Sequence, residues 1–530
     1  MALLLVLAVA AIVRLVSCRG YVVMDESAIL FNIAHFVRHH TFLPSNFSYP
    51  TLFSYLATLP TAVTGWVLHR MGMAPTPADF IGMFAFDSVL PLVGARLTSV
   101  AFGVATLAVV YATGRTFFTP AVGLLAAAVL ALSQFHIGYS ALALPDATAA
   151  FFAAACVYGA LAALQRGGVW FPLAGAAAGL AATSKYNAVM IAPAIVAAYL
   201  LRLNARPPVP PASMRPVRTV VWTACAAAVA FLAGSPGWLV IPRTFWDQQV
   251  LLSRHMAAGH FGMFGTPYLL QAQSLWLGEG TTALVFGAGL VHALWQPRRA
   301  RWVLVAAIVP AFLALSAWQV KSVHYLLFLF PALAILGAEA VCEALRRARR
   351  EVITATVVAV LAWPAWLTGR SVAMNLREDN RWAATRWIES AVPSGTKILA
   401  DWSYVPRLVD GDERDRFERL RRGDLAAHHP GALRTYDLVR LEPRIAWLLG
   451  HDEGEFLVTS ASCYERFLAG TIPPVGNPLR EPFIQERDFY RTLLVNPDRL
   501  GLKPVVDFGA GPGPRVLVFA RAPADSAARP

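Results

Sequence analysis

The sequence has few charged residues for its length. Charged side chains make up 15% of the 530 residues, whereas a soluble protein has about 25%. Acidic residues are the scarcer kind, 32 against 45 Lys and Arg, and the formal net charge is +13. Hydrophobic residues make up 57%, and the mean hydropathy is +0.52. This composition excludes an ordinary soluble protein and predicts a polytopic helical membrane protein.

Cysteine is scarce as well, and its pattern indicates neither a disulfide framework nor a zinc site. The five cysteines are odd in number, and no CxxC spacing is present. His255 and His260 lie close together downstream of Asp247, but two histidines at this spacing are weak evidence for a metal. The sequence therefore does not indicate which cofactor the protein uses. It is compatible with a bound divalent cation but does not require one.

Long apolar runs recur from Met1 to about Leu367, and none long enough to cross a bilayer follows Arg370. The first run lacks a basic start and has Arg14 and Arg19 at its far end, which is not typical of a cleaved signal peptide. About eleven membrane helices are predicted. Their ranges are Met1–Val16, Leu92–Thr113, Pro120–Ile137, Ala147–Leu164, Trp170–Thr183, Ala188–Leu203, Val220–Val240, Leu275–Trp295, Trp302–Trp318, Tyr325–Leu345 and Val352–Leu367.

The excess positive charge lies in short gaps between these runs. The basic residues of the gaps are Arg115, Arg166, the stretch from Arg202 to Arg218, Arg298 to Arg301 and Arg346 to Arg350. This distribution is typical of cytoplasmic loops, so it argues against nucleic acid as a partner. It predicts a cytoplasmic N-terminus, a C-terminal region outside the cytoplasm, and a multi-pass protein of a bacterial inner (plasma) membrane.

Two regions of the sequence are not predicted to span. Within residues 27–70, Ala28–Val37 and Thr51–Val67 have the pattern of amphipathic helices lying at the interface. Residues 371–530 predict a small α/β domain with a helix at Asp379–Ala391. Short strands are predicted at Lys397–Ala400, Glu455–Thr459, Val505–Phe508 and Arg515–Phe519, and helical stretches at Arg444–Leu449 and Phe489–Leu494. The division is therefore a membrane domain over 1–370 and an extracytoplasmic domain over 371–530.

Charged residues from separate hairpins are predicted to meet on the outer side. They are Asp25, Glu26, Arg96, Asp146, Lys185, Lys321 and His260. A carboxylate near hydrocarbon is costly to keep, and a carboxylate beside cations suits general base catalysis on a substrate with an anionic headgroup. Asp25 is the predicted base, because it lies at the membrane edge.

Structural alternatives exist for the other predicted residues. Glu26 and Asp146 suit the first turn of a helix, where carboxylates are favoured. Arg96 and Lys185 are placed where a long basic side chain extends from a helix end to the interface. His260 is predicted to contact substrate.

Eight segments resemble, in order, the membrane glycosyltransferases of the GT-C class. They are VVMDESAILFNIAHF, SYPTLFSYL, GARLTSVAFGVATL, ALPDATAAFF, GLAATSKYNAVMIAP, AAGHFGMFGTPYLL, VHYLLFLFPALAILGA and REDNRWAATRWIESAVPSGTKILADWSY, spread from Val22 to Tyr404. The similarity is to the protein O-mannosyltransferase and aminoarabinose (lipid A) transferase group, of the glycosyltransferase family 39 type.

The resemblance implies an inverting transfer of a sugar from a polyprenyl-phosphate carrier to an acceptor. By it Asp25 is the base, Glu26 accompanies it, Asp146 lies near the sugar, and Arg96 and Lys185 face the carrier phosphate. The sequence departs from the family at two positions. Some members have a basic residue before the proline of the second interfacial helix, where this chain has Tyr49, and some have Arg where it has Ala28.

The predicted function is therefore a hexosyl- or pentosyltransferase that uses a lipid-phosphate sugar donor. Its partners would be that donor, membrane lipid, and a glycan, lipid or protein that offers a hydroxyl or an amine on the non-cytoplasmic face. The alternative is a transporter or flippase of lipid-linked saccharides. Transporters often show inverted repeats and interrupted helices at mid-membrane, and the sequence shows no such repeat.

Overall fold

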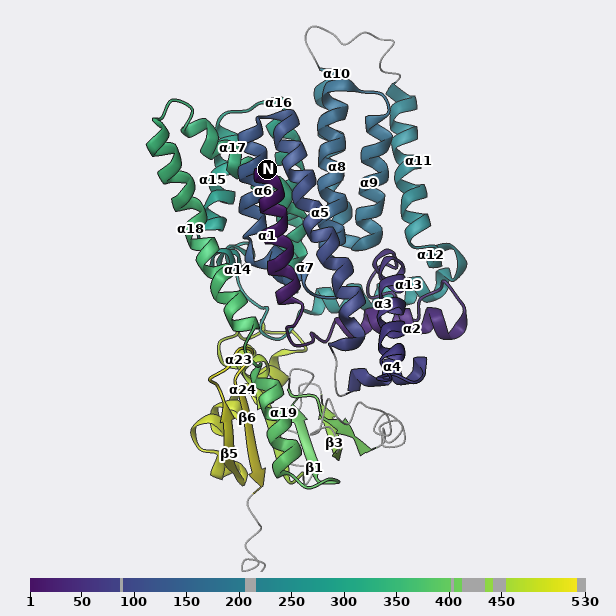
Figure 1. Cartoon of the computed structure of the whole chain (residues 1–530), viewed down its shortest axis with the longest axis vertical. Helices are drawn as coiled ribbons and strands as arrows, with labels where there is room; N and C mark the ends of the chain where they lie inside the picture. Colours follow the sequence, from purple (N-terminus) through teal and green to yellow (C-terminus); the bar gives the residue numbers. More distant parts are fainter. Residues whose placement is uncertain (86–88, 205–215, 402–404, 412–433, 442–453, 522–530) are drawn as a thin grey trace, which may run out of the picture.

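The computed structural model consists of a helical bundle with a six-stranded sheet against one end (Figure 1). The structure describes residues 1–85, 89–204, 216–401, 405–411, 434–441 and 454–521. The helices before the sheet are α1 (Ala2–Ser17), α2 (Glu26–His39), α3 (Leu52–Arg70), α4 (Pro77–Gly82), α5 (Val93–Phe117), α6 (Pro120–Ala131), α7 (Gln134–Ser140), α8 (Asp146–Arg166), α9 (Trp170–Ser184), α10 (Pro193–Leu203), α11 (Pro216–Gly234), α12 (Gly237–Val240), α13 (Pro242–Ala258), α14 (Leu269–Glu279), α15 (Thr281–Trp295), α16 (Arg299–Ala317), α17 (Phe330–Ala344), α18 (Arg350–Asn375) and α19 (Asn380–Ala391). Short 3-10 helices precede three of them, η2 (Leu90–Leu92) before α5, η3 (Tyr186–Ile191) before α10 and η5 (Val323–Leu329) before α17.

The predicted count of eleven membrane spans is not confirmed. Within the described residues, seven helices are long and apolar enough to cross a membrane, or eight if α6 and α7, bent by 65°, form one span. All eleven predicted segments are helical, but α1, α9 and α15 have only 16, 15 and 15 residues. A 15-residue helix is about 23 Å long, shorter than the roughly 30 Å of hydrocarbon. The predicted C-terminal ends of α1, α9 and α15 agree with the structure to within one residue, so the difference lies in counting helices this short as spans.

The bundle is held together by small residues at close helix contacts. Gly289 of α15 and Gly337 of α17 lie so close that a Cβ on Gly289 would be 2.3 Å from the amide nitrogen of Gly337. An alanine at either position would push the two helices apart. The main apolar core includes the fully buried Leu107, Leu304 and Phe330, from α5, α16 and α17.

Helices α2, α3 and α4 lie at the end of the bundle that faces the sheet (Figure 1). The first two are the helices predicted from their amphipathic pattern within residues 27–70. One face of α2 is buried through Ile29, Leu30 and Ile33, whereas Phe31 and Val37 are exposed. Thr76 caps α4 in a capping box with Asp79, which satisfies amides at its first turn.

The sheet has the strand order β2-β3-β1-β4-β6-β5. Its strands are β1 (Lys397–Asp401), β2 (Val409–Asp410), β3 (Thr435–Leu441), β4 (Phe456–Ser460), β5 (Leu502–Phe508) and β6 (Val516–Arg521), with α23 (Ala461–Leu468), α24 (Arg480–Val495) and the 3-10 helix η8 (Pro497–Leu500) between β4 and β5. Strands β1 to β4 are parallel, and β6 is antiparallel to both β4 and β5. Strand β6 points away from the bundle (Figure 1), so the carboxyl ends of β1 and β4 face the bundle.

The predicted α/β character of the C-terminal region is confirmed. The four predicted strands appear as β1, β4, β5 and β6, with ends shifted by one to three residues, and the predicted helices at Asp379–Ala391 and Phe489–Leu494 lie in α19 and α24. Strands β2 and β3 were not predicted. The predicted helix at Arg444–Leu449 lies outside the described residues.

Candidate functional site

A buried ion pair joins Glu26, the first residue of α2, to Arg96 of α5. Their side chains are 0% and 1% exposed. Arg96 donates from Nε to Glu26 Oε1 at 2.8 Å and from Nη2 to Oε2 at 2.7 Å, and from Nη1 to the carbonyls of Cys18 and Gly20. The Glu26 carboxylate also accepts from the Ala143 amide at 2.6 Å. Every Arg96 nitrogen is occupied, so this pair fixes the connection between α1 and α2 against α5.

Asp25 is the residue that this pair holds in place. It is the N-cap position of α2, its side chain is exposed, and it makes no capping hydrogen bond. The Tyr49 hydroxyl donates a hydrogen bond to its carboxylate. Burial, followed by the negative charges of Asp25 and Asp146, raises the pKa of Tyr49 well above its usual value. Tyr49 therefore stays protonated and acts as a donor to Asp25.

A second buried pair lies beside Asp25. Lys185 Nζ, at the junction of α9 and η3, is 2.6 Å from Asp146 Oδ1 at the start of α8, and both side chains are buried. The Lys185 ammonium also lies 5.1 Å from the ring centre of Tyr325. Asp25 interacts electrostatically with Asp146 and with Tyr325, which places the two carboxylates in one site. Lys185 forms an ion pair with one of these two carboxylates, Asp146, and the other, Asp25, is exposed.

His260 reaches the same site from the connection between α13 and α14. Its electrostatic neighbours are Asp25, His255 and Arg466 of α23. Burial lowers the pKa of His260 below its ordinary value, so the imidazole is neutral at neutral pH. The next residue, Phe261, is buried among residues of the C-terminal region, with its ring centre 5.1 Å from that of Phe467. The sheet region thus holds this connection next to Asp25.

Lys321 is a buried cation near this connection. It is 6% exposed, and burial lowers its pKa. No carboxylate among the described residues pairs with it. Gln319, two residues earlier, lies beside Gly259, since a Cβ on Gly259 would be 3.5 Å from that of Gln319. Lys321 is therefore one cation of this region that an anionic ligand could meet.

The predicted site residues thus fall into two groups. The structure brings Asp25, Asp146, Lys185 and His260 together, whereas Glu26 and Arg96 face each other beneath Asp25. The sequence reasoning missed Tyr325 and the part played by Tyr49. Tyr49 stood out only as the residue that replaces a basic one before Pro50. No group of three or more His, Cys, Asp or Glu within the described residues is arranged to hold a metal ion.

Comparison with known proteins gives one family match and several structural ones. The family described as dolichyl-phosphate-mannose-protein mannosyltransferase matches residues 83–239, which include Arg96, Asp146 and Lys185. No curated protein sequence matches this chain.

Two similar solved structures are of ArnT from Cupriavidus metallidurans. The structure bound to undecaprenyl phosphate has 13% identity and a TM-score of 0.50, over 98% of both chains. The apo structure has 14% identity and a TM-score of 0.51, over 97% of both chains. AglB of Archaeoglobus fulgidus is less similar, with 11% identity and a TM-score of 0.47 over 98% of this chain and 88% of that one. The chain therefore has the ArnT fold along nearly its whole length, and the resemblance of its motifs to the GT-C glycosyltransferases is confirmed.

Proposed function

We propose that this protein is an inverting glycosyltransferase that moves a sugar from a polyprenyl-phosphate carrier to an acceptor hydroxyl or amine. The observation that carries the proposal is the exposed Asp25 carboxylate, oriented by Tyr49 and adjacent to the buried Asp146–Lys185 pair. The ArnT structure of the same fold was solved with undecaprenyl phosphate bound, which supports a lipid-phosphate carrier.

In the proposed reaction, Asp25 removes the proton from the acceptor group as that group attacks the anomeric carbon. The bond from this carbon to the carrier phosphate breaks, and the phosphate oxygen keeps the electron pair. A cation near the leaving oxygen stabilises the developing charge. Lys321 is the proposed cation, because Arg96 is fully occupied and Lys185 is paired with Asp146.

The other residues of the site position the reactants. The Asp146–Lys185 pair is proposed to bind the sugar, with Tyr325 below the ammonium. His260 is proposed to contact substrate above Asp25, as a neutral imidazole. Glu26 and Arg96 keep Asp25 at the mouth of the site, which is a positioning role. The sequence-based substrate roles of Glu26 and Arg96 stay predictions.

The proposed arrangement places residues 1–370 in the inner (plasma) membrane and residues 371–530 outside the cytoplasm. The sheet lies at the same end of the bundle as α2, which Asp25 precedes (Figure 1). An acceptor from the aqueous side would therefore meet a carrier lipid next to Asp25, with the C-terminal region above the site.

The test is transfer by the purified full chain, reconstituted with polyprenyl-phosphate sugars and followed by release of the carrier phosphate. Asp25→Asn is expected to lower turnover by about a hundredfold or more, because general base catalysis contributes about that much. Asp247→Asn is the matched control, since Asp247 is also exposed and belongs to α13. Unchanged turnover in Asp25→Asn would remove the base assignment. Movement of intact carrier across the bilayer without release of phosphate would instead indicate a flippase.

A further inference from the structure

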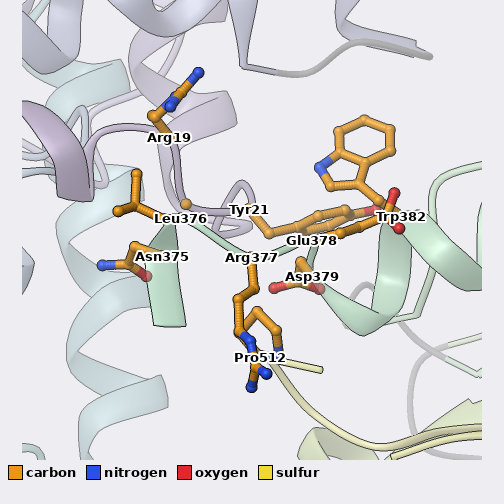
Figure 2. Close-up of a pocket in the computed structure, with 10 residues that line it drawn as sticks. Arg19, Tyr21, Asn375, Leu376, Arg377, Glu378, Asp379, Trp382 and Pro512 are labelled. Carbon is orange, nitrogen blue, oxygen red and sulfur yellow. The ribbon is translucent and has the colours of Figure 1, made fainter. Parts of the chain in front are cut away.

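A pocket lies between the helical bundle and the sheet, and none of the residues assigned to catalysis lines it. Its volume is about 340 Å³, within the range of small-molecule sites. It is lined by the residues that follow α1 and by the connection between α18 and α19 (Figure 2). Asn375 at the end of α18 donates to the Ser17 hydroxyl at the end of α1, so the pocket begins where these two helices end.

The charges of this pocket do not balance. Its two carboxylates are both engaged by arginines outside the lining: Asp379 is 2.8 Å from Arg381, and Glu378 pairs with Arg386. The two lining cations, Arg19 and Arg377, are exposed and have no ion-pair partner among the described residues. Figure 2 shows the Arg19 and Arg377 side chains extending in opposite directions from the chain around Tyr21. Two guanidinium groups are therefore available to an anion that enters.

Two aromatic side chains, Tyr21 and Trp382, form one wall of the pocket. Tyr21 and Trp382 pack with ring centres 5.1 Å apart, and Arg381 covers the other part of Tyr21 at 3.9 Å from its ring centre. The Tyr21 hydroxyl accepts a hydrogen bond from the Arg407 amide at 2.8 Å. Leu376 adds an apolar side chain that is 59% exposed. The pocket thus has one wall of packed aromatic rings and two exposed arginines.

The place of the pocket determines which anions reach it. Helix α1 is apolar, and α18 belongs to a predicted span, so their common end lies where hydrocarbon gives way to water. Exposed arginines at this depth extend toward phosphates of the membrane surface. Guanidinium groups bind phosphate oxygens through paired, charge-assisted hydrogen bonds.

We propose that this pocket is a binding site for a phosphate-bearing headgroup, held by Arg19 and Arg377. Its occupant is an anionic phospholipid or a free phosphate ester of similar headgroup size. Bound there, the phosphate would link the segment after α1 to the start of α19. Gly20, which lines the pocket, accepts a hydrogen bond from Arg96, so the pocket adjoins the Glu26–Arg96 ion pair. The proposal does not depend on transferase activity, because it concerns binding without any sugar donor.

The test measures lipid binding to the delipidated full chain in detergent by native mass spectrometry. The probes are dioctanoyl phosphatidylglycerol, dioctanoyl phosphatidylcholine and glycerol 1-phosphate. We expect one site with at least tenfold preference for phosphatidylglycerol over phosphatidylcholine. The double variant Arg19→Gln, Arg377→Gln is expected to weaken phosphatidylglycerol binding at least tenfold, and Arg19→Lys, Arg377→Lys to retain most of it.

The matched control removes two exposed cations of the sheet region, Arg499→Gln with Lys503→Gln, and is expected to leave binding unchanged. Equal affinity for glycerol 1-phosphate and phosphatidylglycerol would identify a soluble ester as the ligand, and weaker binding of the ester identifies the lipid. Unchanged phosphatidylglycerol binding in the double glutamine variant overturns the proposal. If that variant fails to fold, each single substitution is expected to weaken binding severalfold, and unchanged binding in both overturns it equally.

Discussion

Tyr49 is the position where the resemblance leads one to expect a basic residue in some proteins, and its hydroxyl contacts Asp25. A cation there would neutralise the carboxylate, whereas the Tyr49 hydroxyl orients it through a neutral hydrogen bond. Tyr49 brings no positive charge to the site, and Lys321 is a buried cation of this region.

The substitution Tyr49→Phe removes only this hydroxyl. Turnover is expected to fall about ten- to a hundredfold, because a hydrogen bond to a charged group is worth about 1.5–3 kcal/mol. The measurement is the rate of carrier-phosphate release at saturating donor. Tyr55→Phe is the control, since the Tyr55 hydroxyl donates to the Phe42 carbonyl instead. Equal loss in both variants would show that Tyr49 has no special relation to Asp25.

The ion pair beneath Asp25 predicts a different effect. Glu26→Gln leaves Arg96 charged and buried without its carboxylate, and breaking a buried pair costs about 3–5 kcal/mol. The free energy of unfolding in mixed micelles, measured by titration with a denaturing detergent, is expected to fall by about this amount. Asp25→Asn, at the adjacent exposed position, should stay within about 0.5 kcal/mol of the parent. If Glu26→Gln were as stable as the parent, the Glu26–Arg96 ion pair would not stabilise this part of the fold.

Charge revealed most of the site residues in the sequence, and geometry explains those that it missed. Asp25, Asp146, Lys185 and His260 were recognisable because charged or titratable groups at the end of apolar runs are unusual. Tyr325 carries no charge and lies inside a run that reads as an ordinary helix. The mutual pairing of Glu26 and Arg96, 70 residues apart, depends on how α2 packs on α5, which no local pattern contains.

At the scale of elements, the connection between α13 and α14 depends on the sheet region for its position. Phe261 lies in a core formed with Phe467 of α23 and Phe483 of α24. The substitution Phe261→Ala is expected to cost about 3–5 kcal/mol of packing and to release His260 from its place near Asp25. Turnover should fall more than carrier affinity, as measured by steady-state kinetics. Thr266→Ala, at an exposed position of the same connection, is expected to match the parent.

The end of strand β1 carries a carboxyl group whose protonation affects the sheet. Burial raises the pKa of Asp401 from an ordinary 3.8 to about 6, although Thr459 and Tyr490 donate hydrogen bonds to the carboxylate. The folded form binds this proton more tightly, so its contribution to stability is complete below about pH 4 and is lost as the pH rises through 6. The loss is about 3 kcal/mol for a shift of about two units.

Hydrogen exchange of β1 and β4 between pH 4 and pH 7 measures this contribution. After correction for the intrinsic exchange rate, protection is expected to decrease toward pH 7 in the parent and to change little in Asp401→Asn. Tyr464→Phe, which removes a hydroxyl elsewhere in the same core, is the control and should keep the pH dependence. The same slope in the Asp401→Asn variant would show that another group titrates.

Strand prediction was accurate where apolar residues were continuous and failed where context decides. Strands β1, β4 and β6 lie inside the sheet and have apolar stretches of three to five residues. Strand β3 also lies inside the sheet, but Asp437 and Arg440 interrupt its apolar residues, so its sequence did not indicate a strand. Its pairing with β1 along Lys397 to Asp401 is a tertiary effect. Helix boundaries are subject to the same limit, since the predicted run from Leu275 to Trp295 is divided between α14 and α15 at Gly280.

For the whole molecule, the orientation in the membrane relates the basic connections at one end of the bundle to the proposed catalytic Asp25 at the other. The basic connections lie at the end of the bundle opposite the sheet, as Figure 1 shows for α15 to α16 and α17 to α18. Single cysteines at Asp498 and Pro297, both exposed, test this in a Cys225→Ser background. An impermeant maleimide is expected to label Asp498→Cys in intact spheroplasts and Pro297→Cys only after permeabilisation. Labelling of both in intact spheroplasts would contradict the predicted orientation.

The burial of Phe261 in the sheet region also bears on how this chain can be recombined with its relatives. An exchange of everything after α18 would leave Phe261 facing a foreign core, and His260 would lose its support even though the bundle is untouched. A functional hybrid would therefore have to transplant the connection from Gly259 to Tyr268 along with the C-terminal region. During evolution, as in engineering, Phe261 and its partner Phe467, which lie far apart in the sequence, would then have to change together.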